Sequence, residues 1–279
     1  MDALSGIDRH TRWQLVERLP LVFQTFHPQG LAFGGDLTFL SSVEILENPQ
    51  VTVGETERTR QSAGRGVGHV FVMDHRGTSL GDITLGEGGI YHPGGIDFDG
   101  ALVWVSLAEY RPGSRSIIYT VDPATLETRE RFRVADHIGW VVSDRENGLI
   151  HGGSWGSRRF YTWTADGSAV SRWENPSGFI DYQDCRYVGK GLVVCGGVAI
   201  LPAASGNVEL GGLAVIDMQQ RRIVREFPVP LYSAAGHSVT RNPFTVATNE
   251  KALTMWVAPD DGGEGRGTEI LKYRRSATM

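Results

Sequence analysis

Four of the eight histidines in the chain recur at related positions of a repeated pattern, and they are the first indication of a chemical site. His27 and His92 are both followed by proline, and both stand at the same distance before an apolar strand pattern. The other two are His137 and His237. Because imidazole titrates near neutral pH and is a common ligand of transition metals, such a group can act in acid–base catalysis or hold a metal ion.

The pattern around these histidines predicts the elements that position them. Each copy has a short inner strand, a tight turn, a second strand, a long loop, a third strand and a charged fourth strand. The clearest copy begins at His92, with further strands expected at 102–106, 116–122 and 127–134. Repeats of four short strands are typical of β-propellers, in which each repeat forms one blade.

The copies predict an all-β fold, a five-bladed β-propeller that forms a single domain over residues 1–279. The blades are expected at about 27–86, 92–135, 137–174, 181–229 and 236–275. The last copy lacks a fourth strand, and the segment 10–23 resembles one, so this N-terminal strand is expected to join the C-terminal blade and close the ring. A large β-sandwich is the main alternative, but it gives no reason for the repeated order.

In a propeller, the starts of the inner strands surround one mouth of the central channel, and the longest loops lie on the same face. We therefore expect the four histidines to form a metal site at this mouth. Glu109, Arg115 and Arg158 are the candidate catalytic residues. The candidate substrate-binding residues are Tyr110, Trp155, Gln183, Glu44, His69 and His151.

These residues leave several chemical interpretations open. A divalent transition metal, Zn, Fe, Mn, Ni or Cu, would give a metal-dependent lyase, hydrolase or isomerase acting on a small polar molecule in the funnel. Without a metal, one histidine can act as a general base while Arg115 or Arg158 holds an anionic substrate. The histidines can also simply cap strand starts in a non-catalytic propeller that binds a ligand or a protein. The sequence contains no nucleophile elbow, Walker loop or Cys-x-x-Cys metal spacing.

Composition excludes some partners. The net charge is −5 without long runs of one sign, so a broad basic face for nucleic acid is not expected. No apolar run approaches the roughly 20 residues of a membrane span, and the first residues do not resemble a signal peptide. We therefore expect a cytoplasmic protein, a monomer whose partner is a small-molecule ligand, with no membrane contact.

The two cysteines, Cys185 and Cys195, allow two interpretations. A three-residue turn at 189–191 would place them directly opposite each other, within reach of a disulfide. A cytoplasmic location instead favours two buried free thiols, and this is the preferred interpretation.

Several short runs resemble an uncharacterised bacterial family of five-bladed β-propellers, over nearly the whole chain. These runs are 92–95, 107–110, 114–116, 153–159 and 182–185. The resemblance implies the fold but no assigned reaction, so it supplies no catalytic residues. Calcium-dependent lactonases and metal-dependent lyases are similar only in architecture, and this sequence lacks an obvious match to the lactonases' Glu, Asn and Asp ligands.

Overall fold

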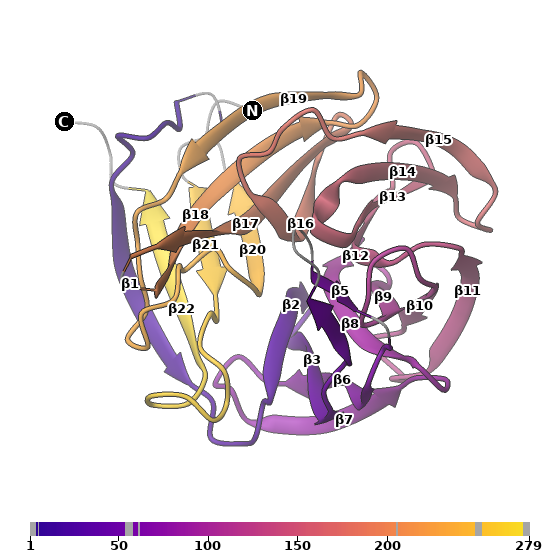
Figure 1. The fold of residues 1–279 in the computed structure, drawn as a ribbon, viewed down its shortest axis with the longest axis horizontal. Helices are drawn as coiled ribbons and strands as arrows, with labels where there is room; N and C mark the ends of the chain where they lie inside the picture. The colour runs from indigo at the N-terminus through magenta and orange to yellow at the C-terminus, as the bar shows by residue number, and fades with distance from the viewer. Residues whose placement is uncertain are drawn as a thin grey trace.

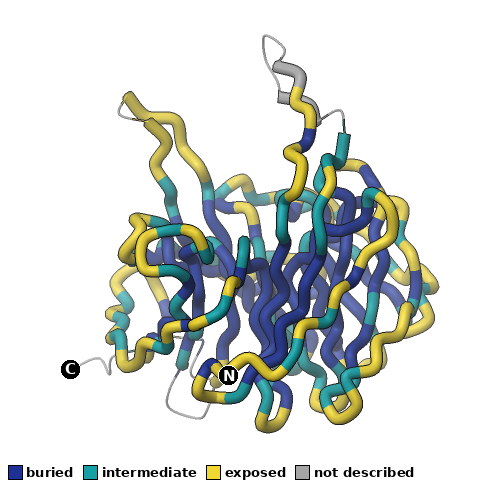
Figure 2. The backbone as a smooth tube through the Cα atoms, turned by 90° about the horizontal axis from the view of Figure 1, so that it is seen from below, coloured by how far each residue is buried: buried dark blue, intermediate teal, exposed yellow. Residues whose placement is uncertain are grey.

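The computed structural model describes residues 4, 6–53, 58–60, 62–204, 206–248 and 253–275, and almost every regular element in them is a β-strand. The strands form sheets arranged around a common centre (Figure 1). Viewed from the side, the sheets form a thick ring with a buried interior and exposed connecting turns (Figure 2). This arrangement confirms the predicted all-β fold and the β-propeller class.

The sheets follow the chain in order. The first has the order β2 (His27–Gly34), β3 (Leu37–Glu47), β6 (Arg65–Met73) and β7 (Ser79–Leu85). An eight-stranded sheet follows. One half contains β8 (Ile90–Phe98), β9 (Val103–Glu109), β10 (Ser116–Val121) and β11 (Thr128–Val134), and the other contains β12 (Ile138–Asp144), β13 (Leu149–Ser154), β14 (Arg159–Thr164) and β15 (Ala169–Glu174). A parallel pairing between β8 and β12 joins the two halves.

The next four-stranded sheet contains β16 (Asp181–Gly189), β17 (Leu192–Ala203), β18 (Gly206–Asp217) and β19 (Arg222–Pro228). The remaining one has the order β1 (Trp13–Pro20), β22 (Glu269–Arg275), β21 (Leu253–Val257) and β20 (Phe244–Thr248). The short strands β4 (Val51–Val53) and β5 (Arg58–Arg60) pair with each other, and η1 (Trp155–Ser157) is a single 3-10 turn. The N-terminal strand β1 thus pairs antiparallel with β22, from Trp13 opposite Arg275 to Pro20 opposite Glu269.

Apolar side chains pack between neighbouring sheets rather than in one central core. Phe39 and Val70 of the first sheet pack with Val105 and Ile117 of the second. Likewise, Trp140 and Phe160 pack with residues of β16–β18, and Leu31 packs with a cluster that includes residues of β21 and β22. Burying both faces of the sheets in this way explains why β9 is buried along its whole length, while the outermost strand β11 is mostly exposed.

The glycine-rich start of β8 is a packing requirement. A Cβ atom at Gly94 would collide with the carbonyl oxygen of Gly139, and one at Gly95 would collide with the carboxylate of Asp184. Glycine is therefore needed where the inner strands approach each other most closely.

The preference for free thiols is wrong, because Cys185 and Cys195 form a disulfide. They are directly opposite each other on β16 and β17, with Cα atoms 4.1 Å apart. Both side chains are buried. The pairing of the two strands brings the two cysteines together, whereas the preference for free thiols was based on the expected cytoplasmic location.

Two hairpins project from one face of the ring (Figure 2). One is β17–β18, which stays paired from Leu192 opposite Asp217 to Ala203 opposite Gly206, and the other contains β4 and β5. None of the helical structure that is described has the length and apolar character to cross a bilayer.

Candidate functional site

A cavity of about 250 Å³ lies where the starts of the inner strands meet, and we call it the funnel cavity. The beginnings of β2, β8, β12 and β16 line it, together with η1, β17 and the segment before β20. Its lining residues are His27, Gln29, His92, Gly94, Tyr110, His137, Gly139, Ser154, Trp155, Gly156, Asp181, Tyr182, Gln183, Ile200 and Asn242. The structure therefore brings together three of the four histidines, and with them Tyr110, Trp155 and Gln183.

Four rings form a continuous aromatic wall on one side of the funnel cavity. His92 stacks on Tyr110 with ring centroids 4.1 Å apart. The ring centroids of Trp155 and Tyr110 are 5.8 Å apart. The rings of His137 and Trp155 form a T-shaped pair with centroids 4.7 Å apart. Such rings offer large apolar faces and a few polar edges to a ligand.

The hydrogen bond of His137 determines which of its nitrogens carries a proton. Nδ1 lies 2.9 Å from the backbone carbonyl oxygen of Glu109, and a carbonyl oxygen only accepts hydrogen bonds. Nδ1 is therefore the protonated nitrogen, which makes Nε2 the acceptor of the neutral ring. The backbone N–H of His137 donates to Asp136, which further fixes the start of β12.

His27 forms a histidine–carboxylate pair at the edge of the funnel cavity. Its Nδ1 lies 2.7 Å from Oδ1 of Asp261, and both side chains are about one quarter exposed, at 27% and 26%. A carboxylate bonded to Nδ1 fixes the tautomer and orientation of the ring and leaves Nε2 as the acceptor that a general base needs. Asp261, in the loop between β21 and β22, was not among the residues predicted from the sequence.

Amide side chains also line the funnel cavity. Gln29 is buried on β2, and Asn242 donates from Nδ2 to the carbonyl oxygen of Pro28 at 2.6 Å. With Gln183 on β16 they add both donors and acceptors to the lining. Gln29 and Asn242 were not singled out in the sequence, because neither belongs to a recognisable motif.

The three residues predicted to be catalytic lie outside the lining of the funnel cavity. The Glu109 side chain is buried and accepts hydrogen bonds from Arg111 at 2.7 Å and from Arg115. Burial alone would raise the pKa of Glu109, but the two guanidinium groups more than compensate and lower it below its ordinary value. Arg158 donates to three backbone carbonyl oxygens and lies 3.0 Å from Asp181, so it braces the loops beside the cavity.

His69, Glu44 and His151, predicted to bind substrate, are likewise absent from the funnel lining. The sequence placed His69 at the end of a loop and His151 at the end of a strand, but β6 begins before His69 and β13 continues past His151. His69 stacks against Phe71 and lies 3.9 Å from Glu44. His151 is fully buried, and its Nε2 lies 3.6 Å from Asp144. Burial alone would raise the pKa of Asp144, but its interactions with His151, Asn147 and Tyr187 outweigh that effect and lower the pKa to about 2.

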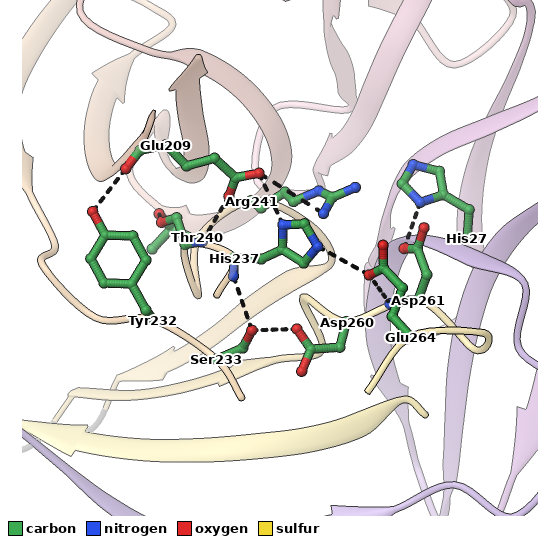
Figure 3. Close-up of polar contacts among 11 residues, drawn as sticks. His27, Glu209, Tyr232, Ser233, His237, Thr240, Arg241, Asp260, Asp261 and Glu264 are labelled. Atoms are coloured by element: carbon green, nitrogen blue, oxygen red, sulfur yellow. Dashed lines mark hydrogen bonds and ion pairs between the residues drawn. The ribbon is translucent and has the colours of Figure 1, made fainter. Parts of the chain in front are cut away.

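His237 lies in a carboxylate network beside the funnel cavity (Figure 3). It was expected at the start of an inner strand, but that strand, β20, begins only at Phe244. Its Nδ1 and Nε2 lie 3.0 Å from Glu209 and from Glu264, respectively. Glu264 also accepts the backbone N–H of Asp261, which connects this network to His27.

The expected metal site has no matching geometry in the described part of the chain. His92 and His137 have ring centroids 6.4 Å apart, while His27 and His237 are each paired with carboxylates. Among the residues that the structure describes, no group of three or more His, Cys, Asp or Glu side chains is placed to hold a metal ion.

Two buried carboxylates connect the inner strands of the ring. Asp184 accepts the backbone N–H groups of Leu31 on β2 and Phe244 on β20, each at 3.0 Å. Burial raises the pKa of Asp184 well above its ordinary value, although these hydrogen bonds oppose the rise. Asp97 pairs with Arg186, and burial raises its pKa to about 6 against the opposing effect of the guanidinium.

The fold and the site define a β-propeller with an aromatic and amide-lined cavity at one mouth of its ring. The chain belongs to the DUF6454 family, a family of unknown function, whose model matches residues 2–270. A search of curated proteins found no match.

Solved structures with similar folds are distant. Hydrazine synthase from Kuenenia stuttgartiensis is 12% identical with a TM-score of 0.46, over 85% of this chain and 57% of that chain. The β-propeller domain of the trilobed protease from Pyrococcus furiosus is 10% identical with a TM-score of 0.37, over 85% of this chain and 65% of that chain. A luciferin-regenerating enzyme is 8% identical with a TM-score of 0.48, over 95% of each chain. This chain thus spans less than two thirds of the first two proteins, and at these TM-scores none of the three bears on its activity.

Proposed function

We propose that the protein is a five-bladed β-propeller, closed by β1, whose funnel cavity binds a small polar molecule. The sheet order supports five units of four strands, since the eight-stranded sheet divides at the single parallel pairing between Trp140 and Gly95. The pairing of β1 with β22 supports the closure.

The observation that carries this proposal is the convergence of His27, His92 and His137 with aromatic and amide side chains on one cavity. These residues come from inner strands and loops far apart in the chain. Ligand sites typically combine apolar and aromatic walls with a few polar groups in this way. The pair of His27 and Asp261 adds a group that can exchange a proton with a bound molecule.

Nuclear magnetic resonance of the histidine rings tests the proposal. We would titrate isotope-labelled protein with a library of small uncharged polyols, carboxylates, phosphates and organic cations. At least one class should shift the signals of His27, His92 and His137 but not that of the exposed His75, and Trp155→Leu should weaken the effect. The proposal is wrong if no class shifts these signals.

A metal-dependent lyase, hydrolase or isomerase is a separate hypothesis with less support. It requires the histidines to share an ion, whereas no group of three suitable ligands is placed for this among the described residues. Elemental analysis of untagged protein decides it: a stoichiometric transition metal that His92→Ala removes would favour the metal enzyme. The monomeric state and the cytoplasmic location also stay predictions.

A further inference from the structure

We propose that the ligand of the funnel cavity is an uncharged, polyhydroxylated ring compound, a sugar or a cyclic polyol. This inference rests on the proposed binding function and names its ligand class. Three features of the cavity carry it: the balance of charge, the amide groups, and the apolar faces.

The charged groups near the funnel cavity are already paired. Arg115 is bonded to Glu109, and Arg158 to Asp181. Apart from the histidines, Asp181 is the one charged residue among the described side chains that line the cavity, and the Arg158 ion pair neutralises it at 3.0 Å. An anionic ligand would have to break one of these ion pairs to gain a guanidinium partner, and a cationic ligand would have to displace Arg158 from Asp181.

The polar lining suits hydroxyl groups. Gln29, Gln183 and Asn242 each carry an amide, which donates and accepts hydrogen bonds. A hydroxyl group also does both, so neighbouring hydroxyls on a ring can bond to one amide. His137 adds a ring that is anchored in one tautomer by the carbonyl oxygen of Glu109.

The apolar lining suits the C–H faces of such a ring. Trp155 and Tyr110 belong to the aromatic wall, and Ile200 on the projecting β17 adds an aliphatic group. Aromatic side chains combine an apolar face with polar edges, which matches a molecule that has apolar faces and a polar rim. The cavity volume of about 250 Å³ lies just below the usual range of roughly 300–1,000 Å³ for ligand pockets, which favours a single small ring over a larger ligand.

The same residues argue for binding rather than glycoside hydrolysis. Hydrolysis of a glycosidic bond uses two carboxyl groups on opposite sides of the bond. Asp181 is the one carboxylate among the described lining residues, and it is ion-paired.

Isothermal titration calorimetry with four probes tests the ligand class. The probes are myo-inositol and D-glucose as uncharged rings, D-gluconate as an anion and choline as a cation. We expect an uncharged ring to bind more tightly than both ions. Trp155→Leu should weaken its binding about tenfold, since the variant removes an aromatic face. Trp256→Leu is the matched control, because Trp256 lines a separate cavity near β1 and should leave binding unchanged.

A second variant tests the charge argument directly. Asp181→Asn leaves Arg158 without its carboxylate, so the affinity for gluconate should increase relative to the affinity for the uncharged ring. Tighter binding of gluconate or choline to the unchanged protein, with a loss in Trp155→Leu, would overturn the ligand class but keep the binding function. If no probe binds and the histidine signals also stay constant with every class of the library, both proposals fail.

Discussion

At the scale of single residues, the environment of each buried acid determines how its charge affects stability. Asp144 and Asp97 are both almost fully buried, yet their pKa values move in opposite directions. Asp144 is surrounded by groups that bond to its ionised form, whereas burial dominates at Asp97 although Arg186 lies beside it. The two residues therefore make opposite contributions to the dependence of stability on pH.

Asp144 should stabilise the protein at neutral pH and lose that effect in acid. Its pKa is about 2 in the folded chain against 3.8 ordinarily, so its contribution is present above pH 4 and is lost as the pH falls toward 2. The shift corresponds to about 2 kcal/mol. Urea unfolding of Asp144→Asn should show this loss at pH 7, with a smaller difference from the unchanged protein at pH 3. Asp36→Asn, at a fully exposed position, is the control and should show no such trend.

Asp97 should give the opposite trend. Its folded pKa of about 6 exceeds the ordinary 3.8, so the folded state binds the proton more tightly. The resulting stabilisation is complete below about pH 4 and is lost as the pH rises through 6. In urea unfolding, Asp97→Asn should lack this decline between pH 4 and 7. A variant with the same decline as the unchanged protein would contradict the assignment.

At the scale of elements, the sequence pattern predicted strands well but not where a side chain lies along them. His27 and His92 were expected at the start of an inner strand, each before a proline, and both line the cavity in the structure. His69 and His151 do not line it, since β6 begins before His69 and β13 continues past His151. Asp261 could not be found, since its contact with His27 joins residues 234 positions apart.

The hairpin of β16 and β17 permits a test at this scale. The disulfide between Cys185 and Cys195 closes a short loop, and removing such a link generally costs about 2–3 kcal/mol. The double variant Cys185→Ala with Cys195→Ala should therefore unfold at lower urea concentration. Dithiothreitol should lower the unfolding midpoint of the unchanged protein and leave that of the double variant where it is. Equal effects on both would show that the disulfide does not contribute.

At the scale of the whole molecule, two strands that are far apart in the sequence, β1 and β22, pair with each other. Leu19 and Ile270 belong to the apolar cluster that packs against the first sheet. The loop that precedes β22 carries Asp261, whose carboxylate bonds to His27 at the edge of the funnel cavity. No local pattern could specify that geometry, because it arises only when all the sheets are assembled.

The pairing of β1 can be tested at Arg18, which lies opposite Leu271 on β22 and forms an exposed ion pair with Glu269. Arg18→Pro puts a residue that cannot donate a backbone hydrogen bond into the paired strand and should lower the free energy of unfolding by more than Arg18→Gln does. Arg18→Gln removes only the exposed ion pair, so it should cost less than about 1 kcal/mol. Urea unfolding separates the two variants. Similar midpoints for Arg18→Pro and Arg18→Gln would mean that β1 does not close the ring in solution. A much lower midpoint for Arg18→Pro, together with a broadened His27 signal in that variant, would link closure to the funnel cavity.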